Sequence, residues 1–164
     1  LCEEARSTEG GAAVCSIAQE LFPKGFSCAG TPRAVNALKD AAEKAGALQV
    51  KVQGEHAVHT SLMAAAAAEF GEALDNTLPS MKPPRCAVYM NVTGSQIRAG
   101  TSPQDIVNLL KKQLTSPVIW DSSVRAIIKE GVTEFYEVGP MKQLKAMMKR
   151  IDAKVWNTTY NVEV

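Results

Sequence analysis

The sequence lacks several features by which whole classes of protein are recognised. Its 18 basic and 17 acidic side chains leave a formal net charge of +1, which predicts no nucleic-acid partner. No apolar run approaches the roughly 18 residues of a membrane span, so we expect no transmembrane segment. Aromatic residues make up only 5%, yet 46% of the 164 residues are hydrophobic. This share excludes a disordered tail and, with the length, predicts one globular domain or slightly more.

The four cysteines are widely spaced and contain no Cys-x-x-Cys pair. They are Cys2, Cys15, Cys28 and Cys86. Such spacing is not that of a zinc ribbon or a thioredoxin-like motif. Because a core of this size needs no disulfide, we interpret them as buried free thiols, which favours a reducing intracellular compartment.

The first third of the chain has the order of a small α/β module. Apolar β-formers predict a hairpin of strands at 13–17 and 26–29. A helix is predicted to begin after Thr31, with proline in its first turn, and to end before Gly46. Alternation of apolar and polar residues predicts a half-buried strand at 48–52. This order is most of a ferredoxin-like module that lacks its first strand and most of its first helix.

Strand and helix patterns alternate in the rest of the chain. The predicted helices cover 61–76 or begin at Ser102, at Asp121 and after Gly139-Pro140, and the predicted strands cover 86–91, 132–138 and 153–157. This alternation indicates a parallel sheet covered by helices. We therefore predict an α/β fold in two parts, residues 1–53 and residues 54–164.

Two histidines lie between a predicted strand and a predicted helix, where α/β proteins place reacting groups. They are His56 and His59, and three interpretations stay open. Both can be ordinary loop side chains. With Glu55 they can start a metal site, although no third and fourth ligand can be named. One imidazole can also act as a general base toward a hydroxyl nucleophile.

A serine nucleophile in its usual Gly-x-Ser-x-Gly turn is absent from the sequence. The nearest strings, at 93–95 and 121–123, lack the flanking glycines. A base without a nucleophile and an oxyanion hole would lose most of its rate. We therefore expect this chain on its own to be inactive as an acyltransferase.

Four separated segments together resemble the malonyl-CoA:acyl carrier protein transacylases of type II fatty acid synthesis. In chain order they are the histidine segment 57–63, the strand 88–94 ending in Asn-Val-Thr, the Gln-Leu-x-x-Pro-Val-x-Trp segment 113–120 and the Glu-Val-Gly-Pro turn in 135–140. The likeness runs from Leu1 to about Asn157. It implies an incomplete α/β-hydrolase-like transacylase core with a truncated ferredoxin-like subdomain at the N-terminus.

The resemblance implies roles for two residues. His59 falls on the family's catalytic histidine, which activates the nucleophilic serine and later protonates the leaving thiolate. Gln113 falls on the glutamine whose main-chain carbonyl orients that histidine. The implied reaction transfers malonate from malonyl-CoA to the phosphopantetheine thiol of acyl carrier protein, with no metal and no resident cofactor.

The sequence also departs from the family's pattern. The Gly-His-Ser-Leu-Gly nucleophile turn, the oxyanion-hole glutamine and the malonate-binding arginine have no counterpart in residues 1–164. Val58 stands where an aromatic residue or serine is usual, and Met141 stands where the family has glycine. The family's Asn-rich segment appears as residues 19–21, Gln-Glu-Leu. Because the chain opens on Leu1 within what we interpret as a helix, we expect a preceding segment, removed or carried by another chain.

Three hypotheses for function follow. The chain is part of a working transacylase whose serine comes from other polypeptide. Alternatively, it is an inactive transacylase remnant kept as a structural or accessory subunit of a larger organellar or membrane-bound complex, because a half-sheet leaves unpaired groups for a companion chain. Thirdly, the basic residues Lys142, Lys145, Lys149 and Arg150 form a docking patch for coenzyme A or acyl carrier protein rather than a solvated face. The family implies a plastid, a mitochondrion or the bacterial cytoplasm.

Overall fold

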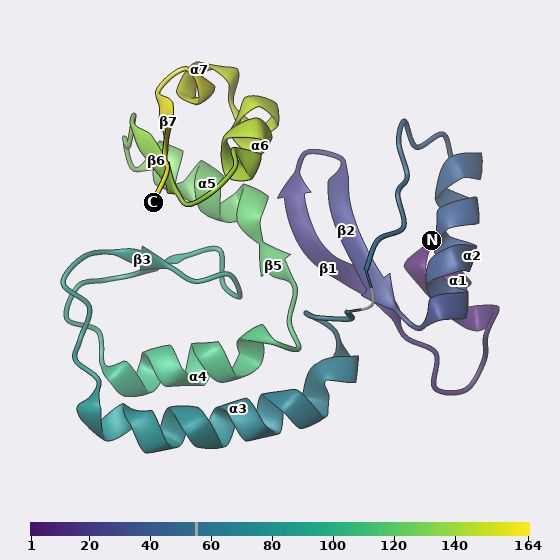
Figure 1. The fold of residues 1–164 in the computed structure, drawn as a ribbon, viewed down its shortest axis with the longest axis horizontal. Coiled ribbons are helices and arrows are strands. Elements are labelled where there is room, and N and C mark those ends of the chain that lie inside the picture. Colours follow the sequence, from purple (N-terminus) through teal and green to yellow (C-terminus); the bar gives the residue numbers. More distant parts are fainter. Residues whose placement is uncertain (55) are drawn as a thin grey trace.

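Helices and three small sheets make up the computed structural model, which describes residues 1–54 and 56–164 (Figure 1). The helices are α1 (Cys2–Ser7), α2 (Pro32–Lys44), α3 (Ala64–Thr77), α4 (Pro103–Gln113), α5 (Trp120–Lys129), α6 (Gln143–Ile151) and α7 (Ala153–Trp156), with 3-10 turns η1 (Ser61–Met63) and η2 (Leu78–Ser80). The strands are β1 (Cys15–Phe22), β2 (Gly25–Gly30), β3 (Val88–Tyr89), β4 (Gln96–Ile97), β5 (Val118–Ile119), β6 (Phe135–Val138) and β7 (Thr159–Val162). The sheets have the orders β2-β1-β5, β3-β4 and β6-β7. The predicted α/β class is confirmed.

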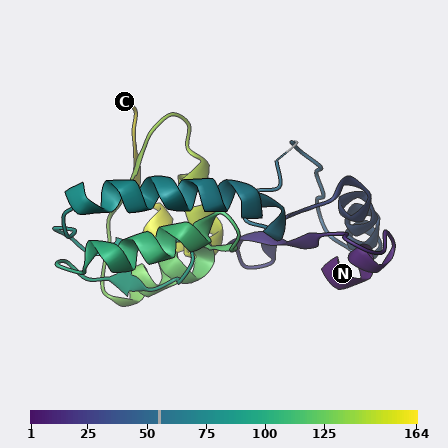
Figure 2. The same cartoon turned by 90° about the horizontal axis from the view of Figure 1, so that it is seen from below.

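The predicted N-terminal hairpin is present as the antiparallel pair β1–β2. Helices α1 and α2 cover one of its faces and bury a cluster of small side chains, Ala5, Cys15 and Ala34. Helix α2 begins after Thr31, as predicted. Its first turn is capped from a distance, because the Glu9 carboxylate accepts hydrogen bonds from the Ala34 amide at 3.0 Å and from the Thr31 hydroxyl. Figure 2 shows α1 and α2 at one end of an elongated molecule.

Strand β1 also reaches the rest of the chain. It pairs in parallel with β5, so that Gln19 lies beside Val118. At its far end, the Phe22 ring packs against the C-terminal hydrophobic cluster and lies 4.9 Å below the Arg150 guanidinium. One end of the hairpin therefore packs in the N-terminal cluster, and the other end packs against the C-terminal cluster.

The C-terminal cluster gathers larger side chains from α5, α6 and α7. Its buried members are Val124, Met148, Ile151 and Val155. Strands β6 and β7 pair in parallel beside it. Helices α3 and α4 lie side by side (Figures 1 and 2), and Lys111 bridges them by an ion pair to Asp75 at 2.6 Å. Among the described residues, no helix has the length and apolar character that crossing a bilayer requires.

Two predicted strands are wrong. Residues 48–52 form no strand, because their alternating apolar side chains have no sheet to cover: Leu48 is fully exposed and Val52 is about half exposed. Residues 153–157 form α7 instead, because Asp152 Oδ1 accepts hydrogen bonds from the Lys154 and Val155 amides at 2.8 and 3.1 Å and so caps a helix. The last strand is β7, further along the chain.

The cysteines are free, but their predicted burial is correct only for Cys15. Cys2 and Cys28 are half-buried, and Cys86 is exposed. Cys86 lies in the segment between η2 and β3, which follows two prolines and packs little against the helices.

Candidate active site

His59 occupies an unusual backbone conformation just before η1. Its φ of +66° lies in the left-handed region, one of three such non-glycine residues in the described part of the chain. For an L-residue this conformation costs about 1 kcal/mol or more, so surrounding contacts must maintain it. The His59 amide donates a hydrogen bond to the Leu114 carbonyl at 2.9 Å.

The imidazole of His59 is held by the main-chain carbonyl of Gln113, the residue before Leu114 at the end of α4. Its Nδ1 lies 2.9 Å from the main-chain oxygen of Gln113. A carbonyl oxygen can only accept a hydrogen bond, so Nδ1 carries the proton and Nε2 of the neutral ring keeps its lone pair. The last carbonyls of a helix have no partner within it, and α4 ends at Gln113. The end of α4 thus supplies successive acceptors to the ring and the backbone of His59.

Thr60 stabilises the same turn and was missed by the sequence analysis. Its side chain is only 2% exposed. The hydroxyl donates to the Ala57 carbonyl at 2.6 Å and accepts from the Leu62 amide at 3.3 Å. The only sequence signal was the Thr of the histidine motif, and nothing in the sequence indicates that this hydroxyl closes the turn.

His56 lies apart from this arrangement. Its side chain is exposed and borders a hollow of about 370 Å³ between the start of α2 and the segment before η1. His59 does not line this hollow. Within residues 1–54 and 56–164, no group of three His, Cys, Asp or Glu side chains could hold a metal ion, and Glu55 lies outside the described residues. The described residues give the metal interpretation no support.

Hydrogen bonds also fix the other motif segments. The Asn91 carbonyl accepts the Ile119 amide at 2.8 Å, which joins the segment 88–94 to the segment 113–120. The Glu137 carboxylate accepts the Leu144 and Lys145 amides, each at 2.9 Å, and so caps α6. The first contact places the segment 88–94 against the segment that contains Gln113, and the second fixes the start of α6 on β6.

Two of the four cations singled out on α6 have aromatic partners. The Lys149 ammonium lies 4.7 Å from the Trp156 ring, and Arg150 lies over Phe22. Such contacts hold cationic side chains against the protein surface. The other two members of the predicted docking patch, Lys142 and Lys145, lie near the start of α6.

Among the described residues, no serine hydroxyl is hydrogen-bonded to the His59 ring. Ser123, in one of the two strings nearest to a nucleophile motif, is buried and donates to the Ile119 carbonyl at 2.7 Å. Its proton is thus already engaged by the residue that precedes α5. The arrangement fixes the orientation of an imidazole, and the Ser123 hydroxyl is engaged elsewhere.

Comparisons with known proteins give the same family from sequence and from fold. No family model matches the chain. The chain is 32% identical over 158 residues to the mitochondrial malonyl-CoA-acyl carrier protein transacylase of Homo sapiens, covering 92% of this chain and 39% of that protein. The solved acyl-carrier-protein S-malonyltransferase of Burkholderia pseudomallei superposes with a TM-score of 0.86 at 28% identity, over 98% of this chain and 49% of the other.

A second solved structure is described as a type II PKS acyl-carrier protein in complex with its malonyl-transacylase. It superposes with a TM-score of 0.81 at 26% identity and covers 99% of this chain and 50% of that one. The chain thus spans between about two fifths and one half of the length of the proteins it resembles. Over about 92% of its own length, the chain matches the malonyl-CoA-acyl carrier protein transacylase family.

Proposed function

We propose that this chain is the histidine-bearing part of a malonyl-CoA:acyl carrier protein transacylase. The observation that carries the proposal is the 2.9 Å separation between His59 Nδ1 and the Gln113 oxygen, since it joins two motif segments that lie 54 residues apart. In this proposal residues 1–53 form a truncated ferredoxin-like subdomain, and residues 54–164 form part of the transacylase core.

The proposed chemistry follows from the orientation of the ring. His59 Nε2 removes the proton of a serine hydroxyl as that oxygen attacks the thioester carbonyl of malonyl-CoA, and then returns the proton to the leaving coenzyme A thiolate. In the second half, the same nitrogen removes the proton of the phosphopantetheine thiol, which takes the malonyl group from the serine. The Gln113 carbonyl accepts a hydrogen bond from Nδ1–H throughout, so the ring keeps one orientation in both half-reactions.

The serine of this mechanism comes from polypeptide outside the 164 residues, since the sequence contains no nucleophile turn. Acyl carrier protein is the proposed partner, and the relative solved with an acyl-carrier protein supports it. A companion chain stays a prediction. The mitochondrial human relative and the bacterial one support a mitochondrion or the bacterial cytoplasm, whereas a plastid location stays a prediction.

The decisive experiment compares the two histidines in protein purified from its native source, with any companion chain retained. Incubation with malonyl-CoA followed by intact-mass spectrometry is expected to reveal a malonyl adduct on a serine. His59→Ala should lower the rate of malonyl transfer to acyl carrier protein about 10²–10⁴-fold, the usual contribution of a general base. His56→Ala is the matched control, because its exposed side chain is outside the arrangement, and should retain the rate.

The opposite result is equally informative. Native material that ends at Val164, with no companion chain and no malonyl adduct, would rule out the transacylase proposal. It would leave the inactive-remnant hypothesis, which no observation among the described residues or the comparisons favours at present.

A further inference from the structure

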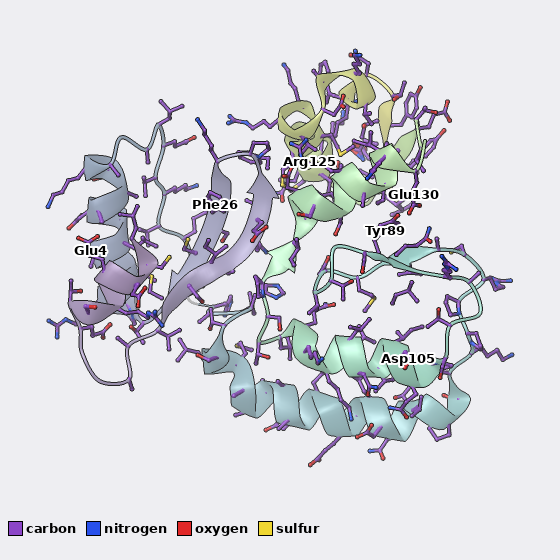
Figure 3. The ribbon with its side chains drawn as sticks, turned by 180° about the vertical axis from the view of Figure 1, so that it is seen from behind. Glu4, Phe26, Tyr89, Asp105, Arg125 and Glu130 are labelled. Atoms are coloured by element: carbon purple, nitrogen blue, oxygen red, sulfur yellow. The ribbon has the colours of Figure 1, made fainter. Side chains whose placement is uncertain are left out.

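Three of the four thiols converge in the N-terminal part of the molecule. In the β1–β2 register, Cys15 lies opposite Gly30 and Ile17 lies opposite Cys28, so Cys15 and Cys28 project from the same face of the hairpin. Helix α1, which begins with Cys2, covers that face. Figure 3 shows sulfur atoms, in yellow, gathered between the hairpin and the two N-terminal helices.

The three thiols differ in spacing and access. The Sγ atoms of Cys2 and Cys28 are 4.0 Å apart. Both side chains are half-buried, so a small reagent can reach them, and Cys28 is one of the residues that line the hollow beside the start of α2. Cys15 is only 2% exposed and is a diagonal cross-strand neighbour of Cys28, a relation that separates backbones by about 7–8 Å. Proximity and access therefore single out one pair.

We propose that Cys2 and Cys28 form a dithiol that a small disulfide oxidant, such as oxidised glutathione, converts into a disulfide joining α1 to β2. The Cys2 thiolate attacks one sulfur of oxidised glutathione, forms a mixed disulfide and releases one glutathione thiolate. The Cys28 thiolate then attacks the Cys2 sulfur and releases the second glutathione. Two protein thiols are oxidised, one small disulfide is reduced, and the two protons pass to the released thiolates.

The local structure allows the sulfurs to approach. They must close from 4.0 Å to about 2.05 Å, which rotation of the two side chains and a small shift of α1 can supply. Helix α1 has only six residues. It is joined to β1 through Gly10 and Gly11, which have positive φ values and no other atoms close to where a Cβ would lie.

Burial sets the order and the speed of the two steps. It is the main cause that raises the pKa of Cys28 to about 12, with Cys2 nearby as the next cause, so Cys28 suits the second, intramolecular step better than the first. Burial likewise raises the pKa of Cys15 to about 11, again with Cys2 nearby as the next cause. Cys15 is set apart from Cys28 by its 2% exposure rather than by this pKa. Oxidation should therefore be slow at neutral pH and faster in mild alkali, where more thiolate is present.

The experiment uses the whole reduced chain and the exposed Cys86 as an internal reference. After incubation with oxidised glutathione at mildly alkaline pH, peptide mapping without reductant is expected to find Cys86 carrying glutathione. The peptides of Cys2 and Cys28 should instead be joined, with the loss of two hydrogens and no glutathione. The cross-link should raise the unfolding temperature by roughly 5–10 °C.

Two substitutions complete the test. Cys28→Ser should leave Cys2 carrying glutathione and remove the rise in unfolding temperature, and Cys2→Ser should do the same for Cys28 if the first variant does not fold. Cys86→Ser is the matched control and should lose only the glutathione adduct. Wild-type Cys2 and Cys28 that stay free, that each carry glutathione, or that pair with Cys15 or Cys86 would each overturn the proposal.

Discussion

The two hydrophobic clusters of this chain are built from very different side chains. The N-terminal cluster buries two alanines and a cysteine, whereas the C-terminal cluster buries two valines, an isoleucine and a methionine and gathers aromatic rings around them. Because the free energy of burial scales with apolar area, the second cluster contributes far more hydrophobic stabilisation. The N-terminal part depends more on hairpin hydrogen bonds and on the Glu9 cap. Strand β1 belongs to both, with Cys15 at one end and Phe22 at the other.

The largest expected effect comes from the C-terminal cluster. Met148 is 2% exposed, and Met148→Ala should lower the free energy of unfolding by about 2–5 kcal/mol, since it removes buried methylenes and leaves a cavity. Cys15→Ala, at an equally buried position of the N-terminal cluster, should cost about 1 kcal/mol, because it removes a single sulfur. Urea unfolding of both variants measures the difference. Equal losses would show that the two clusters contribute alike.

Two carboxylates that cap helices extend the comparison to polar groups. Glu137 is 9% exposed and accepts two amides of α6, whereas Glu9 is half-buried and accepts one amide of α2 and one hydroxyl. Glu137→Ala should cost about 2 kcal/mol, because it leaves two amides without acceptors in a buried place, and Glu9→Ala about 1 kcal/mol. The Glu→Gln variants keep one acceptor oxygen and should recover part of each loss. Thermal unfolding that ranks Glu9 above Glu137 would contradict this order.

The N-terminal part should lose stability in alkali. Burial raises the pKa of Cys15 to about 11 and of Cys28 to about 12, above the value of about 8.5 for an exposed thiol. The stabilisation is therefore complete below about pH 8.5 and is lost as pH rises through the folded pKa values, because the unfolded chain releases these protons first. By pH 10, about 1.5 units above the unfolded pKa, the expected loss is about 2 kcal/mol for each thiol.

Urea midpoints at pH 8 and pH 10, measured with reductant present, test this loss. Cys28→Ser should show a smaller decrease than the wild-type chain, and the exposed Cys86→Ser should show an unchanged one. Tyr89, whose pKa is raised to about 12 by desolvation and by Glu130, adds a loss near pH 10 that is common to all three chains and so does not affect their comparison. A decrease of the same size in Cys28→Ser would mean that this thiol does not ionise on unfolding in that range.

Sequence patterns predicted the elements whose stabilising contacts come from residues close in the sequence. The hairpin, the start of α2 and the cap of α4, where the Ser102 hydroxyl accepts the Gln104 amide, follow from turn and capping chemistry. The predicted strand at 48–52 failed because alternation needs a neighbouring strand, which no local pattern supplies. Helix α7 was missed because Asp152 was not considered as a cap.

The site could be predicted only as far as the motifs extend. The resemblance placed His59 and Gln113 in one site, and the structure brings them within hydrogen-bonding distance. The left-handed backbone at His59 and the buried Thr60 hydroxyl depend on how the end of α4 meets the turn before η1. Such details are tertiary, because they need partners that are distant in the chain.

The smallest expected effect concerns backbone strain outside the site. Met141 has a φ of +74° and a side chain that is 63% exposed, at a position where the resemblance implies glycine. Glycine adopts this conformation without strain, so Met141→Gly should raise the free energy of unfolding by about 0.5–1 kcal/mol after its larger unfolded-state entropy is counted.

The matched control is Met147→Gly within α6, which should lower the free energy of unfolding by about 1 kcal/mol, because glycine is unfavourable inside a helix. Chemical denaturation measures whether each variant raises or lowers the free energy of unfolding. A lower value in both variants would show that the positive φ at Met141 does not reduce stability. His59 also has a positive φ, but glycine could not replace it in the same way. The strain at His59 is maintained by hydrogen bonds from its amide and its ring to successive carbonyls, and a glycine there would remove the ring that the proposed chemistry requires.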